Sequence, residues 1–256
     1  MTSSAAKGPR GEFVQSSSLE VDGNQQLAKF AREYADRPDF MWSSNAHLLM
    51  KRQAISRVLY YDSLYRTLVG TPGVICEFGV QWGATMALLA NLRGIHEPFN
   101  HSRKIIGFDT FSGFSTVRPE DGELVESGSY SVSEDYEVTL TEVMALHESF
   151  SPIPHMRKFE IVKGDASTTV PQWLEANPHA VIGMAIFDMD VYQPTRDALL
   201  AIRPRLTKGS VLVFDELNHQ LFPGETVAVQ EVLGLDSLRL RHDPNQPNCA
   251  WAVWGE

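Results

Sequence analysis

The chain has 256 residues, of which 32 are acidic and 22 are Lys or Arg, so its formal net charge is −10 at pH 7. This balance argues against a nucleic-acid-binding surface, and no apolar run approaches the roughly 18 residues that a membrane span needs. The two cysteines, Cys76 and Cys249, lack the spacing of a metal site. They are typical of buried thiols in a reducing compartment, and we expect a cytoplasmic protein without membrane or nucleic-acid partners.

The length fits one α/β domain with an extension, and we expect three parts. Residues 1–18 are rich in Ser, Gly and Ala and lack an apolar core, which predicts a disordered tail rather than a signal peptide. Residues 19–70 are expected to form a helical extension, with helical periodicity over 19–36 and 45–69. These helices cover a ligand cleft, form a subunit interface or pack against a sheet. The main domain is expected over 71–256.

From residue 73 the apolar pattern alternates between strands and helices, which predicts βαβ units with right-handed crossovers. Continuous apolar runs such as A-V-I-G-M-A-I-F are typical of parallel strands buried on both faces. Strands are expected over 74–78, 104–108, 159–162, 181–187 and 210–214, with a closing hairpin over 238–240 and 250–254. Helices are expected over 84–93, 139–147, 169–176, 194–203 and 226–233. The fold class is therefore α/β, with a doubly wound, mostly parallel sheet that binds ligands at the carboxyl ends of its strands.

The segment V-I-C-E-F-G-V-Q-W-G-A-T over 74–85 predicts a strand, a glycine turn and the start of a helix. Gly79 and Gly83 lack the Cβ that would keep a ligand away from the backbone, and Glu77 lies at the end of the strand. Gln81 replaces a glycine of the dinucleotide fingerprint, which disfavours a dehydrogenase. An acid followed by G-x-x-x-G suits a nucleoside with a cationic sulfonium. The alternative is an ordinary strand–turn–helix with a capping glycine.

Single acids follow the next two strands. Asp109, in G-F-D-T-F, is placed to accept hydrogen bonds from ribose hydroxyls. Asp165, in K-G-D-A, is placed where an adenine ring would lie. Thr85, Thr110 and Ala166 adjoin these turns and complete the residues that we expect at a bound cofactor.

Four carboxylates follow the fourth and fifth strands of the main domain. Asp188 and Asp190 are two residues apart, so in an extended chain they point to the same side. Asp215 and Glu216 follow the neighbouring strand, about 4.8 Å away. Crowded carboxylates repel one another, no Lys or Arg adjoins either motif, and a magnesium or calcium ion would neutralise them. The alternative is that these acids contact ribose and cap helices.

Residues 112–155 interrupt the alternation of strands and helices. The segment is long and polar and contains several glycines. Because long insertions after a strand are more often functional than idle, we expect a lid over the substrate. The alternative is a solvated surface loop.

These motifs resemble the macrocin O-methyltransferase family (the TylF/MycF type), the sugar O-methyltransferases of natural-product pathways that depend on S-adenosylmethionine and a metal. The resemblance runs from about residue 60 to residue 254. It rests on E-F-G-V-Q-W-G, F-D-T-F-S-G-F, F-D-M-D-V-Y-Q-P-T, and V-F-D-E-L-N followed by F-P-G-E. It implies a seven-stranded Rossmann-like sheet, a methyltransferase domain over 71–256 and a homo-oligomer.

The resemblance also implies roles for the acids. Asp188, Asp215 and Glu216 would bind the metal, and the metal would hold two vicinal sugar oxygens. Asp190 would take the proton from the attacking hydroxyl. Glu216 departs from the aspartate of the family and is one methylene longer. His219 is a second base, a substrate contact, or neither.

The implied function is methyl transfer from S-adenosylmethionine to a hydroxyl of a deoxysugar in antibiotic biosynthesis. The sugar is either nucleotide-activated, such as TDP-rhamnose, or attached to a natural product. Two alternatives stay open: a metal-dependent catechol-type O-methyltransferase acting on an aromatic diol, and a non-catalytic protein that binds S-adenosylmethionine.

Overall fold

The computed structural model describes residues 6–7, 13–14 and 17–256. Most of the predicted tail lies outside these residues, so its disorder stays a prediction. Within it, β1 (Ala6–Lys7) pairs antiparallel with β2 (Phe13–Val14). None of the helices in the described ranges is long and apolar enough to cross a membrane.

A seven-stranded sheet lies at the centre of the described chain, in the order β5-β4-β3-β6-β7-β9-β8. The parallel strands are β3 (Val74–Phe78), β4 (Ile105–Asp109), β5 (Phe159–Lys163), β6 (Ile182–Phe187) and β7 (Leu206–Phe214). β9 (Gln246–Val253) runs antiparallel between β7 and β8 (Arg241–Asp243). The doubly wound sheet is therefore confirmed. The strand order reverses between β3 and β6, where ligands bind in such folds.

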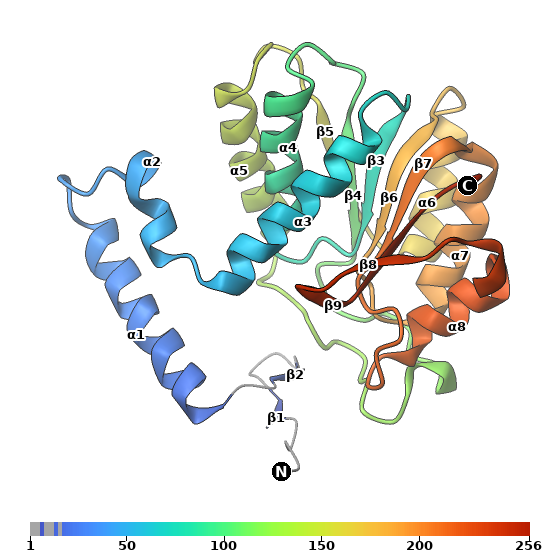
Figure 1. Ribbon diagram of the computed structural model, residues 1–256, viewed down its shortest axis with the longest axis horizontal. Coiled ribbons are helices and arrows are strands. Elements are labelled where there is room, and N and C mark those ends of the chain that lie inside the picture. Colours follow the sequence, from blue (N-terminus) through green and yellow to red (C-terminus); the bar gives the residue numbers. More distant parts are fainter. Residues whose placement is uncertain (1–5, 8–12, 15–16) are drawn as a thin grey trace.

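Helices cover both faces of this sheet and give three layers (Figure 1). One face packs against α3 (Arg52–Leu68), α4 (Ala84–His96) and α5 (Tyr136–Phe150). The other packs against α6 (Ala166–Ala176), α7 (Tyr192–Ile202) and α8 (Pro223–Val232). Because both faces are covered, a central strand such as β6 is buried along its whole length, which explains its continuous apolar run.

Four phenylalanines form a ladder across the middle of the sheet, one on each neighbouring parallel strand. Phe78 of β3 stacks on Phe108 of β4 at 5.2 Å between ring centroids and on Phe187 of β6 at 5.0 Å. Phe187 in turn stacks on Phe214 of β7 at 5.5 Å. All four rings are buried and in register. Three of them directly precede Asp109, Asp188 or Asp215, so the ladder lies beneath the acids at the strand ends.

The helical extension differs from the prediction. The single helix expected over 45–69 is divided into α2 (Trp42–Asn45), a 3-10 turn (Ala46–Leu49) and α3. The break lies at Met50 and Lys51, which both have extended backbone angles, with ψ of 126° and 162°. α3 buries one face in the core beside the sheet and so belongs to the main body. In contrast, α1 (Ser18–Ala35) buries none of its residues.

The expected lid segment is only partly irregular, because its second half contains α5, the crossover helix between β4 and β5. The irregular part before α5 ends at Asp135 and contains a 3-10 turn (Pro119–Asp121). Asp121 is fully buried and accepts hydrogen bonds from the backbone N–H of Arg118 at 2.6 Å and of Tyr192 at 2.5 Å. This carboxylate fastens the irregular segment to the start of α7. The last predicted hairpin is shifted, because β8 begins at Arg241.

Candidate active site

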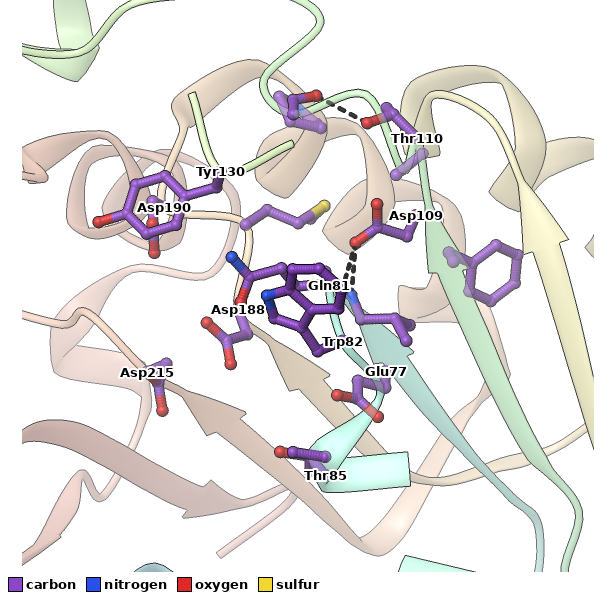
Figure 2. Close-up of a pocket in the computed structure, with 18 of the residues that line it drawn as sticks. Glu77, Gln81, Trp82, Thr85, Asp109, Thr110, Tyr130, Asp188, Asp190 and Asp215 are labelled. Atoms are coloured by element: carbon purple, nitrogen blue, oxygen red, sulfur yellow. Dashed lines mark hydrogen bonds between the residues drawn. The ribbon is translucent and has the colours of Figure 1, made fainter. Parts of the chain in front are cut away.

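A pocket of about 590 Å³ opens at the carboxyl ends of the parallel strands, in the size range of small-molecule sites. In Figure 2, Gln81 and Glu77 lie between Asp109 on one side and Asp188 and Asp215 on the other. Most of the predicted site residues line this pocket: Glu77, Gly79, Thr85, Asp109, Thr110, Asp165, Ala166, Asp188, Asp190, Asp215 and Glu216. The lining does not include Gly83 or His219.

Asp109 holds the turn that follows β3. Its Oδ2 accepts hydrogen bonds from the backbone N–H of Val80 at 2.7 Å and of Gln81 at 2.8 Å, drawn as dashed lines in Figure 2. Its Oδ1 accepts a further bond from the N–H of Phe111 at 2.5 Å. Gln81 adopts a positive φ of 47°, which a side chain rarely tolerates without such support. Asp109 therefore shapes the pocket, and its contact with ribose stays a prediction.

The two glycines of the turn are required by packing within the chain, a reason that differs from the expected approach of a ligand. A Cβ on Gly79 would lie 1.9 Å from the carbonyl oxygen of Asp188, so β3 and the end of β6 could not approach each other. A Cβ on Gly83 would lie 2.3 Å from Cδ1 of Leu140 on α5. Both glycines also have positive φ. They permit packing within the chain, and the expectation that Gly83 makes room for a ligand is not supported, because Gly83 lies outside the pocket.

Glu77 presents an unsatisfied carboxylate to the pocket. The residue is 1% exposed, and its Oε2 has no hydrogen-bond partner among the described residues. Burial, and next the charge of Asp188, raise its pKa well above the usual value. A buried carboxyl without a partner favours a ligand that brings a cation or a donor. The group therefore fits the positive end of S-adenosylmethionine.

Asp165 caps the N-terminus of α6, where it accepts a hydrogen bond from the backbone N–H of Ser167 at 2.8 Å. Its other oxygen accepts a bond from the hydroxyl of Ser115 at 2.5 Å. Ser115 belongs to the irregular segment after β4 and also lines the pocket. Asp165 thus joins this segment to the turn after β5, beside the place predicted for adenine.

Arg57, on α3, is the main site residue that the sequence analysis missed. Its guanidinium pairs with Asp215 at 2.5 Å and with Asp188 at 3.2 Å. The expectation that no basic residue neutralises these acids is therefore wrong. Arg57 is 131 positions from Asp188, so motif spacing could not have revealed it. The burial of the neighbouring Tyr60 and Tyr61, which places this part of the helix in the core, is visible only in the structure.

The three predicted metal ligands do not fit a divalent ion in this arrangement. Asp188 and Asp215 are both paired with Arg57, and no group of three or more His, Cys, Asp or Glu in the described chain is arranged to hold a metal. Glu216 has a buried Oε2 without a hydrogen-bond partner. Burial, and next the charge of Asp215, raise the pKa of Glu216 to about 8. The metal site stays a prediction that this geometry does not support.

Asp190 is buried, and its backbone differs from the prediction. Its φ of 62° lies in the left-handed region, so the chain is not extended there and the argument that placed it on the same side as Asp188 fails. Burial, followed by the charges of Glu216 and Asp215, raises the pKa of Asp190 well above its usual value. A raised pKa brings a carboxylate nearer to the range in which general bases work.

His219 is not among the residues that line the pocket. Its ring stacks on Phe222 at 5.2 Å between centroids, and burial lowers its pKa. Its Nδ1 lies 3.5 Å from Oε2 of Glu216, which lines the pocket, so a role for His219 as a second base or a substrate contact stays a prediction. Phe222 lies 6.3 Å from Tyr130, and Tyr130 lies 5.3 Å from Phe114. Tyr130 and Phe114 line the pocket and form an aromatic wall that the sequence analysis did not predict.

The sheet order and the pocket at its strand ends define the class, the Rossmann-like methyltransferases that depend on S-adenosylmethionine. A family model described as a methyltransferase domain matches residues 76–217. The chain belongs to this family and, within it, to the sugar O-methyltransferases that the motifs predicted.

Solved structures support the narrower assignment. The calicheamicin methyltransferase CalS11 is 39% identical, with 100% of both chains covered and a TM-score of 0.89. The apo structure of CalS11, described as a TDP-rhamnose 3'-O-methyltransferase of calicheamicin biosynthesis, is 38% identical over 95% of this chain and 97% of that chain, with a TM-score of 0.83. The O-methyltransferase NovP, 20% identical over 93% and 99% with a TM-score of 0.58, shares the fold. A comparison with curated protein sequences finds no match.

Proposed function

We propose that this protein transfers the methyl group of S-adenosylmethionine to a hydroxyl of a nucleotide-activated deoxysugar in antibiotic biosynthesis. The observation that supports this most is one pocket with an unpaired carboxylate, Glu77, and a buried candidate base, Asp190. TDP-rhamnose is the preferred acceptor, because CalS11, which is 38% identical, is described as acting on it.

The cofactor would occupy the part of the pocket around β3 to β5. Glu77 would face its cationic end, with Gly79 and Thr85 beside its amino-acid part. α4 begins without a side-chain cap, so its first N–H groups are suited to a carboxylate. Asp109 and Thr110 would lie at the ribose, and Asp165 and Ala166 at the adenine. When bound, S-adenosylmethionine supplies an electrophilic methyl group that needs no activation by the protein.

The acceptor hydroxyl is the less reactive partner, because sugar hydroxyls do not ionise at neutral pH. Asp190, which lines the same pocket, would accept its proton through a carboxylate oxygen. The aromatic wall of Phe114 and Tyr130 would orient the sugar ring and keep water away. Arg57 pairs with two of the three predicted metal ligands, so the proposed reaction does not depend on magnesium or calcium.

An acceptor panel tests this function. The purified protein is incubated with S-adenosylmethionine and TDP-rhamnose, other TDP-deoxysugars, a glycosylated natural product or a catechol, with and without a chelator. Mass spectrometry should show a gain of one methyl group on the TDP-sugar. Turnover of the catechol alone would favour the catechol-type enzyme. Binding of S-adenosylhomocysteine without turnover of any acceptor would favour a non-catalytic protein.

A further inference from the structure

The guanidinium of Arg57 is held by groups from four elements. Besides Asp215 and Asp188 at the ends of β7 and β6, it donates to the hydroxyl of Tyr61 at 3.3 Å and lies 5.0 Å from the centroid of that ring. It also lies 3.6 Å from Sγ of Cys249 on β9. Arg57 therefore has a built binding site, unlike a surface arginine that pairs by chance.

The guanidinium contacts one oxygen of each of the two aspartates that the family resemblance offers to a metal. Nη1 contacts Oδ1 of Asp215, and this atom also accepts a hydrogen bond from the thiol of Cys249 at 3.1 Å. Nη2 contacts Oδ2 of Asp188. A divalent ion between these two strand ends would lie within a few ångströms of the guanidinium, and two cations at that distance repel strongly where little water intervenes.

We infer that Arg57 is the resident counter-ion of the Asp188–Asp215 pair and that a divalent cation reaches these carboxylates only by displacing it. The residues that the family resemblance offers as metal ligands are thus coupled to α3, which carries Arg57 at the pocket wall beside Ala54 and Val58. A change at position 57 would set the affinity of the site for metal without altering any ligand. This inference concerns the same site as the proposed function. Because it is tested by metal binding and the function by turnover, the inference and the proposed function can fail independently.

Calorimetric titration of the full chain with Mn²⁺, without cofactor or acceptor, tests the inference. Arg57→Met should bind Mn²⁺ about tenfold or more tightly than the native chain, because one positive charge is removed from the site. Arg66→Met is the matched control, since Arg66 lies on the same helix and pairs with Asp62 outside the pocket. It should bind Mn²⁺ as the native chain does.

A second substitution assigns the gained affinity. In the Arg57→Met background, Asp188→Asn should remove the gain, because the ion would lose one of the two carboxylates that Arg57 no longer pairs with. Equal affinities of the native chain and Arg57→Met would overturn the inference, and so would a gain that survives Asp188→Asn. If Arg57→Met does not fold, as judged by circular dichroism, Arg57→Gln keeps a polar side chain without the charge. Arg57→Gln should show the same gain in affinity for Mn²⁺. An affinity equal to that of the native chain would overturn the inference.

Discussion

At the scale of single residues, the site brings together carboxyl groups whose ionisation is disfavoured. Glu77, Asp188, Asp190 and Glu216 all have raised pKa values, with burial as the first cause and neighbouring carboxylates next. Arg57 offsets part of this repulsion. Two predictions follow from separate members of the group, one on turnover and one on stability.

Asp190→Asn should lower kcat about a hundredfold to ten-thousandfold, because the base is removed and binding groups are kept. The affinity for S-adenosylhomocysteine, measured by calorimetry, should be unchanged. Since the base works only when deprotonated, the native rate should rise with pH through the raised pKa of Asp190, and this rise should vanish in the variant. Asp197→Asn is the control, because Asp197 lies on α7 and pairs with Arg196 away from the pocket. A near-normal kcat in Asp190→Asn would contradict the assignment.

Glu216→Gln should stabilise the protein at alkaline pH. Folding raises the pKa of Glu216 to about 8, so the folded chain keeps a proton that the unfolded chain releases near 4.5. The free energy of unfolding therefore falls as pH rises between these values, and the substitution removes this loss. We expect the Tm of the variant to exceed the native Tm above pH 8, by about 2 to 4 °C for each kcal/mol of stability that the substitution restores. The difference in Tm between the variant and the native chain, measured by differential scanning fluorimetry, should disappear towards about pH 5. A difference in Tm that does not depend on pH would count against the raised pKa of Glu216.

At the scale of elements, the first turn of α4 forms one wall of the pocket. Ala84 is its first residue and is exposed to the pocket. Ala84→Leu should weaken S-adenosylhomocysteine binding about tenfold or more, because the longer side chain takes up pocket volume. Ala84→Ser, which adds a single atom, should bind as the native chain does. Gly79→Val would not replace this test, because its Cβ would strike the carbonyl of Asp188 and disturb the fold. Equal calorimetric affinities in Ala84→Leu and the native chain would place the cofactor elsewhere.

Elements were predicted well where local pattern decides them, and poorly where distant packing does. β3 has the predicted bounds, because a buried apolar run ends there at a glycine turn. The break at Met50 and Lys51 has no Pro or Gly to mark it, so the periodicity suggested one continuous helix. The acids at the strand ends followed from βαβ topology. Arg57 did not, because its partners are distant in sequence, and the left-handed backbone of Asp190 is unusual for a non-glycine residue.

At the scale of the whole molecule, the N-terminal helices leave apolar side chains uncovered. Leu19 is 81% exposed, Phe30 43% and Trp42 41%, while α1 extends away from the sheet (Figure 1). Because an uncovered apolar surface favours association, we expect a homo-oligomer, as the family resemblance implies. Light scattering should give a mass above 28.6 kDa, and Phe30→Glu should lower it. Leu146→Glu, on the exposed face of α5, should not. A native chain that is monomeric at high concentration would refute this expectation.

The phenylalanine ladder beneath the site has a consequence for motion. Phe78, Phe108, Phe187 and Phe214 are each stacked on a neighbour, so rotation of a ring about its Cβ–Cγ axis requires the packing around it to loosen. The rotation rates of these rings therefore measure how often the packing beneath the carboxylates loosens, and NMR line shapes of labelled phenylalanine record them. The ladder thus provides an internal probe of how rigid the sheet is beneath the proposed site of methyl transfer.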